Sequence, residues 1–467
     1  MLPNAAKMLL GRHEYLTIYP TQENKMADIS PFRGIRFNPE KIKELSDVVT
    51  PPYDVIPETM QKSFYEKHPN NVIRLDKDMP TDSDTPENNP HTRAAGYFQK
   101  WLEEKILIQE EDPSLYVTTV RFKIDGNPIT RLGLIGTVRL EPFSSGVILP
   151  HEETFSKVKS ERLELMKACH ANFSHIFSVY SDQGQISDIL RSVMESTNPI
   201  QHFTDDAGHE HRVWKIADSG IHEKIKKSLE KRTLFIADGH HRYETALNYK
   251  QWIKDNVSNF DDNHPANFIM MYLCAVEDPG LTILPTHRLL SGISEDRRKK
   301  LLEDAKKYFD IDTIVYSAEN PEQGIKELSD KMDASRKSQV IGLVMQNEPA
   351  YYLLRLKTDV METLLGNEIA KPLLELDVTV LTNLVLIKLM GFNKESLDNE
   401  SLIQYTSQYT DAVEAVRQGK TDIAFILNPP SNDQVCRIAE AGYTMPRKTT
   451  FYYPKVITGQ VMNRLDR

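Results

Sequence analysis

Apolar residues recur along the chain in two forms. In segments bounded by turn residues they alternate with polar residues or form short unbroken runs, as is typical of strands. Elsewhere they recur every three or four positions, as on one face of a helix. The sequence Asp125-Gly126-Asn127-Pro128 separates two strand-like segments and predicts a hairpin. We predict strands at 115–124, 131–140, 176–180, 234–237, 268–276, 340–345 and 351–356, and helices at 92–104, 161–169, 186–195, 220–231, 295–309 and 321–331.

Strand-like and helical segments alternate along most of the chain. This alternation favours an α/β or α+β fold with mixed sheets. A chain of 467 residues is long enough for two or three domains, and a polar break at 255–265 marks one boundary. We expect a loose N-terminal extension (1–28), an N-terminal α/β region (29–130), a central core (131–256) and a C-terminal α/β region (262–467).

Composition and charge narrow the classes of function. The 67 acidic and 57 basic residues give a net charge of −10, without a basic block, which argues against a nucleic-acid partner. No apolar run approaches the length of a membrane span, so we expect no membrane partner. The three cysteines stand far apart and show no metal-binding spacing. These features favour a reducing, cytoplasmic location.

The segment 233–247 carries the clearest chemical signal. A strand-like apolar run ends at an Asp-Gly pair, and a helical pattern follows at once. The first turn of a helix presents unpaired N–H groups and the positive end of the helix dipole, which attract anions. Glycine lets a phosphate approach the backbone closely, or lets the backbone take a positive φ. An ordinary turn with solvent-facing polar residues is the alternative. The predicted phosphate-binding residues are Asp238, Gly239, His240, His241 and Arg242.

Seven motifs stand along the chain in a fixed order. They are Pro31-Phe32-Arg33-Gly34, Pro51-Pro52-Tyr53-Asp54-Val55-Ile56, Asn71-Val72-Ile73-Arg74-Leu75, Pro150-His151-Glu152, the Asp-Gly-His-His-Arg turn, Pro285-Thr286-His287-Arg288 and Met445-Pro446-Arg447-Lys448. Together they resemble the bacterial family called domain of unknown function 1015, over roughly residues 29–460. The Asp-Gly-His-His-Arg turn also resembles the phosphate-binding turn of the ParB/sulfiredoxin superfamily, especially its free-serine-kinase branch.

This resemblance implies a fold and an activity. It implies a ParB/sulfiredoxin-like nucleotide-binding core at 131–256, elaborated by α/β regions on both sides. The implied activity is that of a nucleotide-dependent small-molecule kinase. Such an enzyme transfers a phosphoryl group from ATP or ADP, with Mg²⁺, to a hydroxyl such as that of L-serine. Two alternatives stay open: a phosphatase or nucleotide hydrolase, in which water replaces the hydroxyl, and a non-catalytic nucleotide-binding regulator.

The resemblance also implies catalytic residues. Glu152 matches the glutamate that serves as base in the free-serine-kinase branch, and His151 and His240 are the further catalytic candidates. A carboxylate near phosphates can also hold Mg²⁺. The alternative is that Glu152 belongs to an exposed acidic loop without a catalytic role. Lys159 and Arg162 follow at a helical spacing and match basic positions of the family. We expect them to screen phosphate charge, with surface ion pairs to neighbouring glutamates as the alternative.

Other motifs of the family supply candidates for substrate or anion binding. Asp54 follows the stiff pair Pro51-Pro52, a placement that suits metal or substrate binding and equally a turn. Basic residues stand in the last two motifs and just after them, where they are candidates to close over an anion. These residues are His287, Arg288, Arg447, Lys448 and Lys455.

The histidines of the central region raise the question of zinc. His202, His209 and His211 lie close together in sequence, upstream of His240 and His241. Their spacing fits no tight zinc pattern, and cysteine ligands are absent. The sequence therefore argues against a structural zinc site and leaves the metal ligands undetermined.

Overall fold

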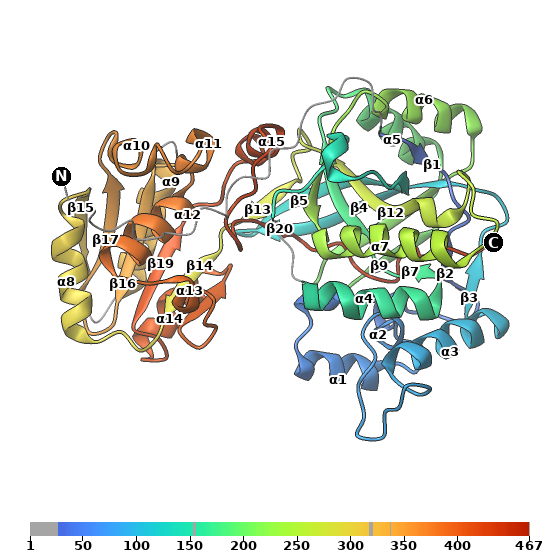
Figure 1. Cartoon of the computed structure of the whole chain (residues 1–467), viewed down its shortest axis with the longest axis horizontal. Coiled ribbons are helices and arrows are strands. Elements are labelled where there is room, and N and C mark those ends of the chain that lie inside the picture. The colour runs from blue at the N-terminus through green and yellow to red at the C-terminus, as the bar shows by residue number, and fades with distance from the viewer. Residues whose placement is uncertain (1–26, 153–155, 317–320, 337, 467) are drawn as a thin grey trace, which may run out of the picture. The chain divides into compact units, whose positions relative to one another are not determined.

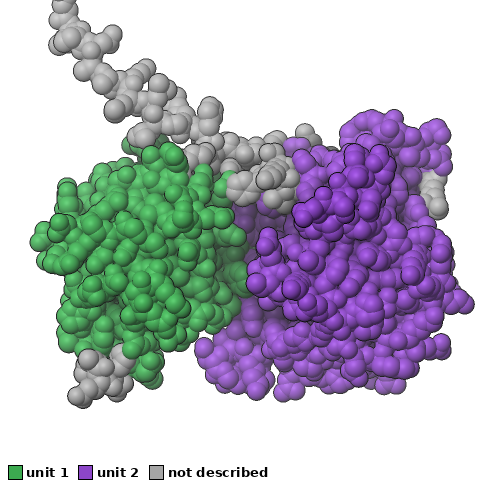
Figure 2. Space-filling view, turned by 90° about the horizontal axis from the view of Figure 1, so that it is seen from below, with its two compact units in different colours: residues 1–18, 283–451 green, residues 19–282, 452–467 purple. Residues whose placement is uncertain are grey.

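The chain forms two compact units. The computed structural model describes residues 27–152, 156–316, 321–336 and 338–466, and gives only the backbone of 156–159, 321 and 394. Within these ranges, residues 283–451 form unit 1, and residues 27–282 together with 452–466 form unit 2 (Figures 1 and 2). The chain passes between the units within β13 (Thr282–Leu284) and β20 (Phe451–Tyr453).

Unit 2 is built on a mixed sheet of nine strands. Their order is β6-β11-β8-β12-β5-β4-β10-β9, with β1 pairing with β5. The pairs β6–β11 and β8–β12 are parallel and the others antiparallel. Two small ladders, β2–β3 and β7–β21, complete the unit. The strands are β1 (Ile29–Ser30), β2 (Ile35–Phe37), β3 (Leu107–Gln109), β4 (Leu115–Ile124), β5 (Asn127–Arg139), β6 (Ile148–Leu149), β7 (Ala171–Asn172), β8 (Ile176–Tyr180), β9 (Gln201–Thr204), β10 (Glu210–Ile216), β11 (Leu234–Asp238), β12 (Phe268–Ala275) and β21 (Asn463–Arg464).

The predicted hairpin between β4 and β5 is confirmed. The two strands pair antiparallel, and Asp125 and Gly126 at the turn have positive φ angles of 49° and 78°. Positive φ at both central residues gives a turn whose twist matches that of the flanking strands. A local turn signal thus sets the register of the two longest strands of the sheet.

The longer helices of unit 2 contribute to two large apolar clusters. One cluster joins α5, α6 and α7 to the sheet, and the other packs α3 and α4 together with β2 and β3 (Figure 1). The helices are α1 (Glu58–Lys67), α2 (Ile73–Asp76), α3 (Pro90–Glu103), α4 (Ser156–Cys169), α5 (Gln185–Ser196), α6 (Ser219–Leu229) and α7 (His240–Asn256), with short 3₁₀ turns η1 (Leu45–Asp47), η2 (Tyr53–Val55), η3 (Phe143–Ser145) and η4 (Pro265–Asn267).

Unit 1 is a six-stranded antiparallel sheet with helices on both faces. The strand order is β15-β17-β16-β19-β14-β18. The strands are β14 (His287–Leu290), β15 (Phe309–Val315), β16 (Val340–Met345), β17 (Ala350–Leu356), β18 (Ile403–Thr406) and β19 (Ile423–Leu427). The helices are α8 (Glu295–Ala305), α9 (Pro321–Ala334), α10 (Val360–Leu365), α11 (Lys371–Leu374), α12 (Asp377–Thr379), the π-helix η5 (Val380–Leu389), α13 (Lys394–Leu397), α14 (Tyr409–Arg417) and α15 (Asn432–Glu440).

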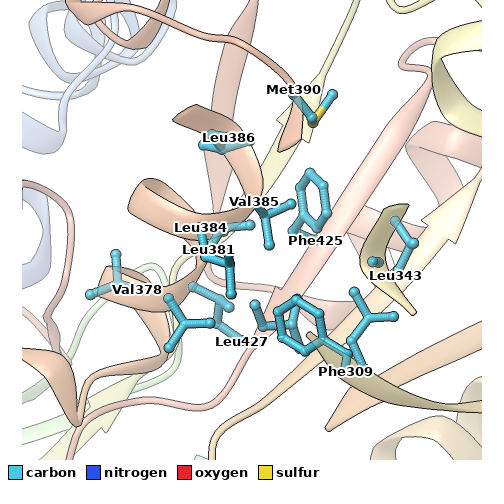
Figure 3. Close-up of a cluster of buried hydrophobic side chains, with 14 of the residues drawn as sticks. Phe309, Leu343, Val378, Leu381, Leu384, Val385, Leu386, Met390, Phe425 and Leu427 are labelled. Atoms are coloured by element: carbon cyan, nitrogen blue, oxygen red, sulfur yellow. The ribbon is translucent and has the colours of Figure 1, made fainter. Parts of the chain in front are cut away.

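Neighbouring residues of the central strands β16, β17 and β19 in unit 1 enter different cores. On β16, Leu343 faces the larger cluster with η5, whereas Val344 faces a second cluster with α9 and α14. Figure 3 shows Leu381, Leu384 and Val385 of η5 directed at the side chains of the sheet. A strand buried on both faces reads as an unbroken apolar run, which is the pattern of 340–345 in the sequence.

The predicted class, a mixed α/β fold with several sheets, is confirmed. The expected boundaries differ from the observed ones. A boundary at 130/131 would cut the β4–β5 hairpin, and residues 452–466 belong with unit 2 because β21 pairs with β7. In the described part of the chain, none of the helices combines the length and apolarity needed to cross a membrane.

Candidate functional site

The predicted strand-to-helix turn is present in unit 2. The strand β11 ends at Asp238, Gly239 has φ 92° and ψ 27°, and α7 begins at His240. The first helical bond runs from Tyr243 N–H to the Gly239 carbonyl at 3.0 Å. Glycine has no side chain to cap the helix, so α7 starts without a side-chain hydrogen bond from its N-cap residue, a backbone arrangement that suits an anion.

Gly239 is required at this turn for two reasons. Its positive φ is costly for any residue with a Cβ. A Cβ at this position would also lie 3.0 Å from Nε of Arg242 and 3.1 Å from its Cζ. The guanidinium therefore packs directly over the glycine Cα, and a larger residue at position 239 would displace it.

Asp238 is held between two cations. One carboxylate oxygen accepts from Arg242 Nη2 and the other from Lys455 Nζ, both at 2.6 Å. Burial alone would raise the pKa of Asp238, but the Lys455 and Arg242 charges outweigh burial and hold it well below its usual range. Asp238 is thus ionised, and it organises the cations instead of meeting a phosphate itself.

Arg242 is buried and fixes the turn to a neighbouring strand. Its Nη1 donates to the carbonyl of His175, which precedes β8, while Nη2 binds Asp238. Its Nε has no hydrogen-bond partner among the described atoms, although the residue is only 8% exposed. Burial works against the charge of Arg242, but Asp238 more than compensates and raises its pKa.

His151 and His240 form a packed pair beside this ion cluster. The His151 N–H donates to Nε2 of His240 at 3.2 Å, and the ring centroids lie 4.6 Å apart at 88°. Nδ1 of His151 lies 2.6 Å from the Ile236 carbonyl and therefore carries a proton. Burial lowers the pKa of His151 to about 4 and that of His240 well below its usual value.

Both imidazoles are therefore neutral at neutral pH. This changes the role expected of His151 and His240, which the sequence placed among the catalytic residues. A buried neutral imidazole that accepts from a backbone N–H positions the segment that supplies it. His240 holds the 150–152 segment through the His151 N–H, and His151 holds it through the Ile236 carbonyl, while a catalytic role for either histidine stays a prediction.

Glu152 lies beside this pair. It directly follows His151, so its Cα lies about 3.8 Å from the Cα of His151. The N–H of His151 in turn donates to His240. It is partly exposed. The structure thus brings together two segments that are far apart in sequence, 150–152 and 238–242. Whether Glu152 is the catalytic base stays a prediction.

Among the described residues, few side chains near the turn could bind Mg²⁺. Asp238 already binds two cations, and no group of three potential metal ligands gathers at this turn within the described ranges. Glu152, which follows His151, and Asp54, whose charge acts on Arg242, are the candidate carboxylates. Mg²⁺ in nucleotide sites is commonly held by one or two carboxylates and the phosphates themselves, so this donor set is compatible with it.

A second ion pair, between Arg162 and Asp76, lies near Arg242. Arg162 of α4 donates through Nη1 to the carbonyl of Asp76 at 2.6 Å, and its guanidinium lies 4.1 Å from the ring centroid of Tyr53. Burial raises the pKa of Asp76, and Arg162 opposes that shift. Arg162, Asp76 and Arg242 line a small cavity of about 40 Å³.

This arrangement connects several family motifs to the turn. Asp54 is exposed, and its charge helps to raise the pKa of Arg242. Asp76 was missed in the sequence, although it directly follows the motif 71–75. Lys455 was named only as part of a basic group, and its pairing with Asp238 was not foreseen. Lys159 falls in the part of α4 where side chains lie outside the described residues.

The remaining candidates belong to unit 1. His287 is buried, its Nδ1 accepts from the Leu427 N–H at 3.3 Å, and burial lowers its pKa to about 3. It is therefore neutral and supplies no charge for an anion, contrary to the expectation. Arg288 donates to the carbonyls of Thr286 and, at 3.0 Å, Lys448.

Arg288 thus supports the loop that contains Arg447 and Lys448. Both of these side chains are exposed, and Arg447 lies 3.3 Å from Asp398. Arg288 also lines a polar cavity of about 330 Å³ within unit 1. That these basic residues bind an anion stays a prediction.

The sequence model of one family matches most of the chain. The family is described as protein of unknown function (DUF1015), and residues 29–379 match it. The chain belongs to this family. Membership had been expected from the seven motifs and is confirmed. Among curated proteins, no match was found.

Several solved structures are similar at low identity. A variant of free serine kinase in complex with AMP has 12% identity and a TM-score of 0.33, with 68% of this chain and 87% of that chain covered. SbnI with a C-terminal truncation, from Staphylococcus aureus, has 10% identity and a TM-score of 0.34, with 70% and 86% covered. A conserved hypothetical protein from Pyrococcus furiosus has 10% identity and a TM-score of 0.31, with 68% and 91% covered.

Proposed function

We propose that this DUF1015 protein binds the phosphates of a nucleotide at the 238–242 turn and transfers a phosphoryl group to the hydroxyl of a small molecule. The observation that carries the proposal is the start of α7, which Gly239 leaves without a side-chain cap, beside the Lys455–Asp238–Arg242 cluster. An uncapped helix start offers N–H donors and a positive dipole to an anion.

The charge balance of the cluster supports an anionic ligand. Asp238 contributes one negative charge, whereas Arg242 and Lys455 contribute two positive charges, so one positive charge is left over. Phosphoryl transfer depends mainly on positioning and on neutralising charge, which fixed cations and backbone amides provide. Arg242 is held at two points, which gives its charge a defined place.

Glu152 is the proposed general base. In the reaction, the hydroxyl oxygen of the acceptor forms a bond to the terminal phosphorus of the donor while the bond to the bridging oxygen breaks. The hydroxyl proton passes to the Glu152 carboxylate, and the shortened nucleotide leaves. Mg²⁺ would neutralise charge on the phosphates. The choice of ATP or ADP as donor and of L-serine as acceptor rests on the motif resemblance alone.

The test separates binding from turnover. The protein is incubated with Mg²⁺, ATP or ADP, and L-serine or pooled hydroxyl compounds, and phosphorylated products are identified by mass spectrometry. We expect Glu152→Gln to keep nucleotide affinity within a few-fold but to lower turnover by about a hundredfold or more, the usual scale for losing a general base. We expect His241→Ala to weaken nucleotide binding measured by calorimetry, because it removes a polar side chain from the first turn of α7.

Glu195→Gln is the matched control, since Glu195 is exposed on α5 and touches none of the site. It should leave both binding and turnover unchanged. Release of inorganic phosphate without a phosphorylated product would identify a hydrolase. Nucleotide binding without turnover by any donor would overturn the kinase proposal in favour of a regulator. Full activity of Glu152→Gln would remove Glu152 as the base and leave Asp54 as the next candidate.

A further inference from the structure

Three metal-ligating side chains meet at the β9–β10 hairpin of unit 2. Asp205 directly follows β9, His209 directly precedes β10, and His211 lies on β10. One ligand atom of each residue lies within 4.8 Å of the other two. Within the described ranges this is the one such group of three histidine, cysteine or acidic residues.

The two oxygen–nitrogen distances in this group are hydrogen-bond distances, slightly shorter than those between ligands around a small ion. Oδ2 of Asp205 lies 2.9 Å from Nε2 of His211 and 3.2 Å from Nδ1 of His209. Ligand atoms about 2.0–2.2 Å from a tetrahedral zinc ion are about 3.3–3.5 Å apart. To hold such an ion, the two oxygen–nitrogen distances need to lengthen by only a few tenths of an ångström, and the two nitrogens already lie within 4.8 Å of each other.

The backbone of the hairpin fixes the carboxylate. Oδ1 of Asp205 accepts from the N–H groups of Ala207 at 3.0 Å and His209 at 2.9 Å, which leaves Oδ2 directed at the imidazoles. His209 and His211 are two positions apart in extended chain, so their side chains fall on the same side of the sheet. Gly208, with φ 79°, permits the tight return of the chain.

The surroundings of the histidines also resemble those of metal ligands. The second ring nitrogen of His209, Nε2, lies 2.9 Å from the Tyr453 hydroxyl. Metal-bound histidines commonly make such a hydrogen bond through the nitrogen that does not bind the metal, which fixes ring and tautomer. The ring of His211 stacks on Phe203 at 5.1 Å and 16°. The side chains of Asp205, His209 and His211 are 15%, 11% and 4% exposed.

We propose that Asp205, His209 and His211 bind one divalent transition-metal ion of the zinc class. Two imidazole nitrogens and one carboxylate oxygen suit Zn²⁺, whereas Mg²⁺ and Ca²⁺ prefer oxygen ligands throughout. The ion would clamp the 205–209 turn and, through Tyr453, hold the returning C-terminal segment to the sheet. This site is independent of the proposed kinase function.

The spacing of histidines and cysteines alone does not reveal this group. Asp205 supplies the third ligand. His202 stays outside the group because it lies 2.8 Å from Glu210, with its side chain about half exposed. His240 and His241 belong to the 238–242 turn.

The test uses the full, untagged protein freed of metal with EDTA and dialysed. Calorimetric titration with Zn²⁺ should show one equivalent bound per chain, and Co²⁺ should give the intense visible absorption of a four-coordinate site. His211→Ala should weaken Zn²⁺ binding by more than a hundredfold. Tyr453→Phe, which removes only the hydroxyl beside His209, should weaken it by about 10–100-fold. The control His202→Ala should bind as the unchanged protein does.

Folding defects are separated by a conservative variant. Asp205→Asn keeps an oxygen for the Ala207 and His209 amides but loses the anionic ligand, so it should fold and yet bind Zn²⁺ much more weakly. Absence of stoichiometric binding would overturn the proposal. So would binding that survives both Asp205→Asn and His211→Ala, or that falls equally in His202→Ala.

Discussion

At the scale of single residues, the turn depends on which groups carry charge. Asp238 is charged and bonded to both Arg242 and Lys455, whereas His151 and His240 are neutral. From the sequence alone, two histidines and an arginine suggest three cations that all bind phosphate. Burial decides otherwise, because a fully enclosed imidazole loses its proton more readily than an arginine beside an aspartate. Sequence alone does not give burial, and the roles of these residues followed from it.

The buried histidines make the stability of unit 2 sensitive to acid. The pKa of His151 is lowered by burial to about 4, and that of His175 to about 3, with Arg242 contributing. In the unfolded chain a histidine binds its proton near pH 6.5, so between pH 6.5 and 4 the unfolded state holds more protons than the folded state. Stability therefore falls as the pH falls, by about 1.4 kcal/mol per pH unit for each such histidine.

The variant His151→Asn tests this slope. Asparagine keeps a donor for the Ile236 carbonyl but does not titrate. The free energy of unfolding should therefore fall less steeply between pH 6.5 and 4.5, with a slope smaller by about 1.4 kcal/mol per pH unit. The measurement is denaturant unfolding at a series of pH values. Ser192→Ala, at an exposed position of α5 that does not titrate, is the control and should leave the slope unchanged. An unaltered slope in His151→Asn would show that His151 is protonated in the folded protein.

At the scale of elements, local signals were sufficient where neighbours in sequence decide the structure. The strands β8 and β16 have the predicted bounds, and α7 begins directly after the Asp-Gly pair. The π-helix η5 was not predicted, because residues 380–389 are apolar on nearly all sides and lack a helical stripe. The pairing of β7 with β21 joins segments almost 300 positions apart, and no local pattern reports it.

The turn itself gives a sharp prediction at this scale. Gly239→Ala should destabilise unit 2 more than Gly146→Ala does. Both glycines have positive φ, so each substitution costs about 1–2 kcal/mol in backbone strain. Only at Gly239 does the added Cβ meet Arg242, whereas nothing lies within 4 Å of a Cβ at Gly146. The displaced guanidinium should add about 1 kcal/mol or more.

Thermal unfolding and nucleotide titration of the two glycine variants measure this difference. Gly146→Ala should keep its affinity for nucleotide. In Gly239→Ala, both the affinity for nucleotide and the stability of unit 2 should fall. Equal destabilisation by the two substitutions would mean that Arg242 does not depend on the space above Gly239.

At the scale of the whole molecule, the sequence predicted the fold class but not the division of the chain. The boundary at 255–265 followed a polar break, which proved to be a connection between α7 and β12 inside unit 2. Unit 1 is inserted between β12 and the last residues of unit 2. An insertion of this kind is recognised only when the ends of the outer domain are seen to pair, and pairing of distant segments is tertiary information.

Two separate hydrophobic cores predict two unfolding transitions. The largest cluster of unit 1 contains only residues of unit 1, and the cluster behind the 238–242 turn contains only residues of unit 2. We therefore expect differential scanning calorimetry to resolve one transition for each unit. Leu384→Ala removes a buried side chain of η5 and should lower the unit 1 transition, which identifies it.

Nucleotide should then act on one transition only. A ligand present at a hundred times its Kd stabilises the form that binds it by about 2.7 kcal/mol, which corresponds to roughly 5–10 °C for a unit of this size. With the phosphate site in unit 2, ATP or ADP should raise the unit 2 transition, and Arg242→Ala should abolish that shift because it removes the buried guanidinium beside the turn. The unit 1 transition marked by Leu384→Ala should stay in place. If nucleotide raised only the unit 1 transition, the phosphate site would have to be sought near the cavity that Arg288 lines, and the 238–242 turn would lose its proposed role.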